Sequence, residues 1–367
     1  MQKTIIAYIL GIANLSAVAA LDAQLVLSPI SEVSNVLPQH GDHSIDESIS
    51  AAIKNHPDPV AAYISLQSED SRAETEEVLA EPRLLQIMGA AKPEWMTEGD
   101  KMRLRRKGTK FMDITDHEAF YAGQTHDAGA KRPNTPELIH ERLIRSLFPY
   151  IDTGRMLDVL KHMTGYYNRY FNDIHGELSS EWLHDHISQA MDQIIANSPL
   201  DTHISLEYFT HSFRQSSIIA RFEPKVRNFS HSLTILGAHQ DSANYLFPLL
   251  PAPGADDDGS GTVSILEAFR VLAEAGFTPK DGPVEFHWYA AEEGGLLGSQ
   301  AIARYKKEQG ARIGAMIEFD MTAFIAKNAT ETIGFISTEA DAVLTAWTAN
   351  LSNKYVSIPA KVYDLPA

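Results

Sequence analysis

The sequence predicts an α/β fold with a mostly parallel (mixed) central sheet and helices on both of its faces. Three short β-rich apolar runs, 232–236, 284–291 and 313–319, alternate with two segments of helical spacing, 262–275 and 297–309. Strands that alternate with helices of this length are typical of βαβ units. We therefore expect one large domain, 94–367, built around this sheet.

The first residues have the pattern of an export signal. A short basic start at Lys3 precedes an apolar run from Thr4 to about Ala20, which ends in small residues. A membrane anchor is the alternative, but the run contains Asn14 and Ser16 and is shorter than the roughly 20 apolar residues of a span. We expect a signal peptide over 1–19 and a secreted, extracellular protein.

The segment from 20 to 93 is polar, with amphipathic stretches and without a cluster that suggests chemistry. Between a signal peptide and a catalytic domain, such a segment indicates a helical propeptide; a small accessory domain that stays attached is the alternative. A basic run over 101–110 follows. It contains either a processing site at Arg105-Arg106 or a solvated helix face. Helical spacing then dominates from about 134 to 191.

The composition excludes some partners. The chain has 367 residues, a hydrophobic share of 44% and a net charge of −17, from 48 acids against 31 bases. So acidic a protein is repelled by nucleic acid and by anionic membranes, and we expect a monomer with neither as partner. The acidity suits a site that collects cations, although a diffuse excess is mostly a solubility trait. Sequons at Asn228, Asn328 and Asn350 permit glycosylation.

Each of the three apolar strands ends in residues that can bind metal or protons. The first leads into His239 and Asp241, the second into Glu292 and Glu293, and the third into Asp320. Ligands of open parallel sheets bind outside the carboxyl ends of the strands, so these side chains should meet at one edge.

A fourth acidic group, 256–258, stands just before the helix over 262–275 and should reach the same edge. Imidazole nitrogen and carboxylate oxygens are zinc ligands, and a carboxylate shared between two ions is a feature of two-metal sites. Each group also has a simpler explanation. His239 could be a core histidine and 256–258 could be helix caps, while Glu292 and Glu293 could be surface acids and Asp320 a turn residue. Their coincidence at one edge favours a metal centre.

Four segments resemble the secreted leucine aminopeptidases of the M28 metallopeptidase family, particularly the fungal enzymes. They are Gly-Ala-His-Gln-Asp-Ser at 237–242, Pro-Gly-Ala-Asp-Asp-Asp-Gly-Ser-Gly at 253–261, Tyr-Ala-Ala-Glu-Glu-Gly-Gly-Leu-Leu-Gly-Ser-Gln at 289–300 and Glu-Phe-Asp-Met-Thr at 318–322. The resemblance implies the zinc-peptidase (phosphorylase/hydrolase-like) fold. It also implies two zinc ions per subunit and the release of N-terminal, leucine-like residues from peptides.

The resemblance further implies roles for single residues. His239 and Asp320 would bind one zinc, Glu293 would bind the other, and Asp257 would bridge the two. Glu292 would be the general base, taking a proton from the attacking water and passing it to the leaving amine. Asp241 would orient the His239 ring. Met321 and Ile336 would line the pocket for the first side chain of the peptide, or would be ordinary core residues.

The chain departs from the family pattern near its end. Family members carry a further zinc-binding histidine and a cysteine-containing segment, whereas this sequence contains no cysteine and no histidine after His287. We therefore expect a catalytic domain that is incomplete at its C-terminus, a second zinc site reduced to Asp257 and Glu293, and impaired activity. A secreted, inactive pseudo-peptidase or peptide-binding protein is the main alternative. A one-zinc relative such as a glutaminyl cyclase is another.

Overall fold

The computed structural model describes residues 43–122, 135–197, 203–245, 248, 250–280, 282–325, 327 and 329–364. The expected signal peptide and the first part of the expected propeptide, up to residue 42, lie outside the described residues. In the part of the chain that is described, no helix combines the length and the apolar character needed to cross a bilayer.

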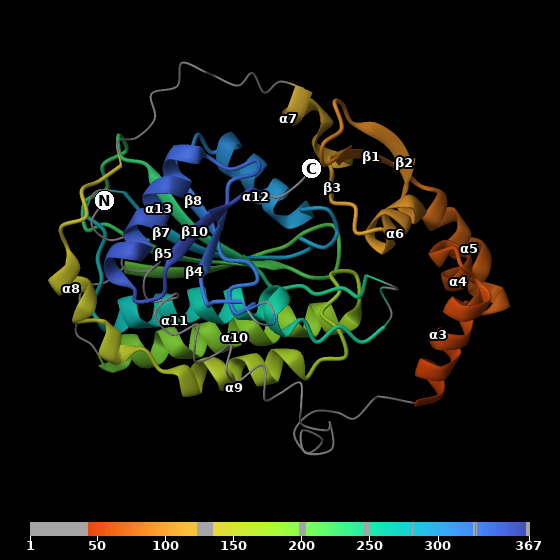
Figure 1. Cartoon of the computed structure of the whole chain (residues 1–367), viewed down its shortest axis with the longest axis horizontal. Coiled ribbons are helices and arrows are strands. Elements are labelled where there is room, and N and C mark those ends of the chain that lie inside the picture. Colours follow the sequence, from red (N-terminus) through yellow and green to blue (C-terminus); the bar gives the residue numbers. More distant parts are fainter. Residues whose placement is uncertain are drawn as a thin grey trace.

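A five-stranded sheet forms the centre of the molecule (Figure 1). Its order is β4 (His203–Phe209), β5 (Ser217–Glu223), β7 (Val284–Tyr289), β6 (Leu233–His239) and β8 (Ile313–Glu318). The β4–β5 and β5–β7 pairs are antiparallel, while β6 pairs in parallel with both β7 and β8. The sheet is therefore mixed, as expected, with β5 running opposite to the other four strands.

Helices cover both faces of this sheet, as expected. On one face lie α9 (Thr153–Thr164), α10 (Ile174–Asn197) and α11 (Gly261–Glu274), and on the other lies α12 (Leu297–Glu308) (Figure 1). The side chains of β7 alternate between these layers, as the pleat of a strand requires. The indole of Trp288 donates to the Thr262 carbonyl on α11, whereas Glu285 accepts from Lys306 on α12.

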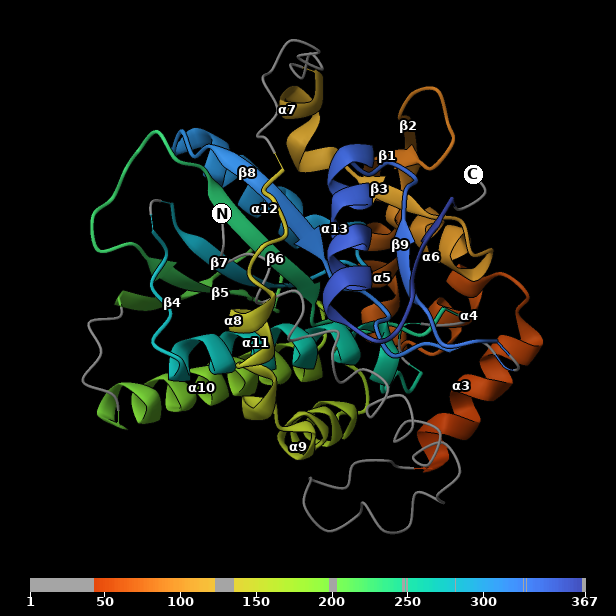
Figure 2. The same ribbon diagram turned by 60° about the vertical axis from the view of Figure 1, so that its left-hand side comes forward.

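The segment after β8 forms a second, small sheet. β9 (Ile333–Ile336) pairs in parallel with β10 (Ala360–Tyr363), and α13 (Ala342–Tyr355) connects them (Figure 2). After β6, the short η4 segment (Ala255–Ser260) leads into α11, while α8 (Glu141–Arg145) and η3 (Phe148–Tyr150) precede α9.

Residues 43–122 form a distinct N-terminal unit beside the sheet domain (Figures 1 and 2). It contains helices and a three-stranded antiparallel sheet of order β2-β1-β3. Its elements, in order, are α3 (His43–Asn55), α4 (Pro59–Ser65), α5 (Glu69–Ala80), β1 (Pro82–Ile87), β2 (Glu94–Thr97), α6 (Glu98–Arg106), β3 (Phe111–Asp113), η2 (Thr115–His117) and α7 (Glu118–Ala122). The unit has its own small apolar core, which includes Ile49, Ala62 and Met102.

The expected propeptide boundary after residue 93 falls inside this unit. β1 and β2, which lie on either side of it, pair from Pro82↔Thr97 to Leu85↔Glu94. The folded unit therefore continues past residue 93, through β3, because the two strands share backbone hydrogen bonds. The processing site itself stays a prediction.

Candidate metal centre

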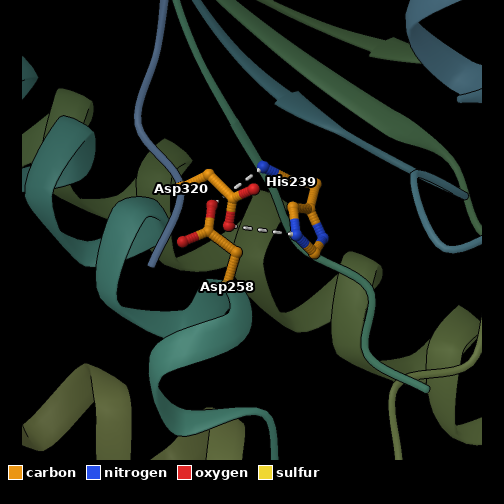
Figure 3. A group of neighbouring side chains, drawn as sticks. All are labelled: His239, Asp258 and Asp320. Carbon is orange, nitrogen blue, oxygen red and sulfur yellow. Dashed lines mark hydrogen bonds and ion pairs between the residues drawn. The ribbon is translucent and has the colours of Figure 1, made fainter. Parts of the chain in front are cut away.

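His239, Asp257 and Asp320 meet at the carboxyl edge of the parallel strands, as the sequence predicts. The Nε2 atom of His239 lies 3.0 Å from Oδ1 of Asp257 and 3.8 Å from Oδ1 of Asp320. His239 ends β6 and Asp320 follows β8, which is the neighbouring parallel strand. Figure 3 shows the His239 ring and the Asp320 carboxylate facing one another.

These separations fit a shared metal ion. Ligand atoms bound to one zinc at about 2.0–2.2 Å in a tetrahedral arrangement lie about 3.4 Å apart. The separations of 3.0 and 3.8 Å lie on either side of this value. One imidazole nitrogen and two carboxylate oxygens also form a donor set that zinc accepts. Each carboxylate therefore lies within zinc-ligand distance of the His239 ring, and among the described residues the set whose three ligand atoms all lie within 4.8 Å of one another is His239, Asp258 and Asp320.

The adjacent acids Asp257 and Asp258 have different surroundings. Asp258 lies within ligand distance of His239 and Asp320 (Figure 3), but its two oxygens accept the backbone N–H groups of His239, at 3.2 Å, and Gly261, at 2.8 Å. Asp258 thus ties the end of β6 to the start of α11. Asp257 instead points one oxygen at the His239 ring, and its other oxygen accepts from the Tyr245 hydroxyl at 3.2 Å. Its two oxygens face different groups, which suits a carboxylate shared between two ions.

Asp241 is fully buried and contacts three parts of the site. One of its oxygens lies 3.3 Å from Nδ1 of His239. Its two oxygens also accept the backbone N–H groups of Glu292 and Glu293, each at 3.0 Å. The sequence indicated only the contact with His239. The structure adds that the same carboxylate holds the turn that carries both glutamates.

The site is electrostatically suited to a cation. Burial, together with the nearby carboxylates of Glu292 and Asp257, raises the pKa of Glu293 to about 8. Burial likewise raises the pKa of Glu292. Burial disfavours the charged form of His239, yet its hydrogen bonds with Asp241 and Asp257 outweigh this and hold its pKa well above the usual value. Carboxylates this crowded are stabilised together when a cation joins them.

A cavity of about 400 Å³ opens beside the two glutamates. Its walls include Glu292, Glu293 and Tyr245, together with residues 105–111 of the N-terminal unit. Met321 and Ile336, the predicted pocket residues, are not among its described walls. They are 44% and 43% exposed, so neither is a core residue.

The basic run at 101–110 is not simply a solvated helix face, because some of its side chains bond other parts of the chain. Arg105 is buried and donates from Nε to the Glu293 carbonyl at 2.7 Å, and its Nη2 donates to the same oxygen. Arg106 donates to the Pro57 carbonyl at 2.7 Å. The sequence did not indicate this contact, because a basic side chain that bonds a carbonyl 188 residues away has no local signal.

The comparisons with known proteins agree with this geometry. Residues 217–364 match the model of peptidase family M28. The chain is 40% identical to leucine aminopeptidase 1 of Chaetomium globosum, over 72% of this chain and 66% of that protein. It is 36% identical to leucine aminopeptidase 1 of Colletotrichum graminicola, over 82% of this chain and 75% of that protein.

Solved structures show the same fold. The Legionella pneumophila LapA aminopeptidase superposes with a TM-score of 0.63 at 25% identity, over 78% of each chain. Legionella pneumophila LapB gives a TM-score of 0.61 at 23% identity, over 79% of this chain and 80% of that one. From the family match, the sequence relatives and the edge of the sheet where His239, Asp257 and Asp320 meet, we conclude that this chain belongs to peptidase family M28.

Proposed function

We propose that this protein is a zinc aminopeptidase that releases N-terminal, preferably leucine-like, residues from peptides. The observation that carries the proposal is the convergence of Asp257 and Asp320 on Nε2 of His239, with two buried or partly buried glutamates beside them. The names of the sequence relatives support the aminopeptidase activity.

The residues of the site divide the chemistry between them. His239, Asp257 and Asp320 would hold one zinc ion, and Asp257 with Glu293 a second. Zinc, when bound, would polarise the scissile carbonyl and lower the pKa of water. Glu292 takes the proton of the attacking water on its carboxylate and passes it to the leaving amine. Burial raises the pKa of Glu292 above its usual value, which makes its carboxylate a stronger base.

The two metal positions differ in the ligands that the described residues offer. The first has three protein ligands, which is the number of a catalytic zinc site. The second has two, Asp257 and Glu293. We therefore propose that the first position binds zinc more tightly, and that activity is lower than in a relative with two complete sites.

The remaining sequence expectations form part of the proposal. The export signal at 1–19 and the sequons at Asn228, Asn328 and Asn350 favour a secreted glycoprotein. The acidic net charge favours a monomer that binds peptides with free N-termini rather than nucleic acid or membranes. Met321 and Ile336 remain the candidates for the side-chain pocket.

The N-terminal unit supports a zymogen. Arg105 and Phe111 help to close the cavity beside Glu292 and Glu293. Lys110 lies 5.9 Å from the centre of the Tyr245 ring and lines the same cavity. Its ammonium group adds positive charge where a peptide would bring its own N-terminal ammonium. We propose that the attached unit obstructs peptide binding.

The zymogen proposal predicts that loosening this contact increases activity. Arg105→Ala combined with Lys110→Ala removes the bonds to Glu293 and the charge near Tyr245, so kcat/KM for leucine-p-nitroanilide should rise several-fold. Lys92→Ala, an exposed lysine in the loop between β1 and β2, serves as the control and should change nothing. If the double variant keeps its zinc and is no more active than the parent, the unit does not obstruct the site.

Zinc-dependent hydrolysis tests the proposed function directly. The purified chain, stripped with a chelator, should not hydrolyse leucine-p-nitroanilide, and activity should return as zinc is added back, reaching most of its value at one ion per chain. The same preparations are assayed with peptides that carry an N-terminal glutamine, to detect cyclisation of that residue. Tight zinc binding without any hydrolysis would favour the pseudo-peptidase, and cyclisation alone would favour a glutaminyl cyclase.

A further inference from the structure

We infer that Arg169 is a positioning residue that sets the separation of His239 and Asp257. Arg169 lies in the segment between α9 and α10, is fully buried, and is absent from every role considered above. The inference rests on the proposed metal centre, because it assigns a function to the distance between two of its ligands.

The Arg169 guanidinium bonds both ends of one loop. Its Nε donates to the Gln240 carbonyl at 2.8 Å, and Nη2 donates to the Gly254 carbonyl at 2.9 Å. Nη1 donates to the Pro253 carbonyl. The loop between these bonds begins next to His239 and ends three residues before Asp257, so one side chain holds both ligand-bearing segments.

The Arg169 backbone joins the same cluster. Its N–H donates to Oγ of Ser242 at 3.0 Å, and its carbonyl accepts the N–H of Ser242 at 3.3 Å. Oγ of Ser242 in turn donates to the Ala252 carbonyl at 2.7 Å. These contacts bring 242 and 252 together, which closes the loop at its base.

The close contacts of Gly254 show that the two ends of this loop are tightly packed against Arg169. Gly254 has a φ of +53°, and a Cβ there would lie 2.8 Å from Nη2 of Arg169 and 2.5 Å from Cβ of Ser242. A side chain has no room in that space, and the left-handed backbone favours glycine in any case. The backbone at 254 therefore packs directly on the guanidinium.

Arg169 acts through geometry rather than through a salt bridge. The hydrogen bonds of its guanidinium given above go to carbonyl oxygens, and the planar group can donate to them in several directions at once. Burial lowers the pKa of Arg169 to about 10, so it stays charged at neutral pH, and the site acids Asp241 and Asp258 favour that charge. Lysine at this position would keep the positive charge but lose the planar guanidinium. Arg169→Lys therefore separates the contribution of the charge from that of the hydrogen-bond geometry.

The test uses the full chain and two measurements on Arg169→Lys and Arg169→Met. The first is hydrogen–deuterium exchange of metal-free protein over 240–261. The second is binding of Co²⁺, followed by its visible absorption, which reports on ligand geometry. Arg270→Lys is the matched control, because Arg270 on α11 is also buried but bonds Glu267 on the same helix and the Tyr150 carbonyl of η3.

We expect both Arg169 variants to exchange faster over 240–261 and to bind Co²⁺ at least tenfold more weakly, with an altered spectrum. Arg270→Lys should lower the melting temperature and leave both readouts unchanged. Unchanged exchange and Co²⁺ binding in the Arg169 variants would overturn the inference, as would full rescue by lysine.

Two further outcomes remain decisive. If the Arg169 variants do not fold, Ser242→Ala, which removes one bond to the Arg169 N–H, should still weaken Co²⁺ binding several-fold; unchanged binding would count against the inference. If the parent chain binds no Co²⁺, the proposed metal function fails, while the exchange measurement still decides whether Arg169 holds the loop.

Discussion

Replacing Glu292 by glutamine should lower kcat for leucine-p-nitroanilide by about 10³-fold, within the range that a general base contributes. Glutamine has the same shape, and the backbone N–H at 292 keeps its bond to Asp241. The substitution removes only the capacity to accept and return a proton. Because the proposed ligands are untouched, zinc content and KM should stay close to those of the parent.

The neighbouring glutamate gives the control for this result. Glu293→Gln changes an adjacent residue with the same chemistry, yet we expect it to lower the affinity for the second zinc rather than to stop proton transfer. Parallel measurements of zinc per chain and kcat separate the two roles. The assignment of Glu292 as the general base is wrong if Glu292→Gln retains more than a tenth of the parent activity. It is also wrong if Glu292→Gln, rather than Glu293→Gln, loses zinc.

Replacing Asp241 by asparagine should weaken zinc binding by about 10- to 100-fold, the usual effect of losing a residue that orients a metal ligand. Both Asp241 oxygens accept backbone N–H groups, from Glu292 and Glu293. Asparagine has one oxygen, so its NH₂ group would face an N–H donor inside a buried site. We therefore also expect a loss of about 1–3 kcal/mol in the free energy of unfolding.

Asp256→Asn provides the comparison for Asp241. It removes the same charge from the same acidic region, and its Oδ1, which accepts from Ser260 and from the Ala323 N–H, is kept in asparagine. Zinc titration and urea unfolding of both variants should show a large change for Asp241 only. Equal losses in zinc affinity would mean that charge, rather than the bonds of Asp241, maintains the site.

Much of the fold could be predicted because each core element has a local signal. The helix at 262–275 and the strand at 284–291 agree with α11 and β7 to within a few residues. The sequence analysis did not predict β4 (203–209). In the structure its residues alternate between more and less exposed positions, as those of an edge strand do. The reversed direction of β5 could not be predicted, since strand direction depends on contacts between segments distant in the sequence.

The N-terminal unit shows the same limit. Its amphipathic helices are visible in the sequence, but the pairing of β1 with β2 and β3 is not, so the expected boundary after 93 divides a sheet. The contact of Arg105 with the Glu293 carbonyl was equally hidden. A basic run gives the same pattern whether its side chains are solvated or buried.

The sequence by itself determined which residues stand at the metal edge: His239, Asp257, Glu292, Glu293 and Asp320 each follow a strand or precede a helix, and parallel strands bring their carboxyl ends together. Only the tertiary structure decided that Asp257 faces the imidazole while Asp258 bonds backbone, and that Arg169 and Asp241 hold the segments in register. The physical reason is that chain direction follows from local patterns, whereas the orientation of a buried side chain depends on hydrogen-bond partners that the fold brings from far along the chain.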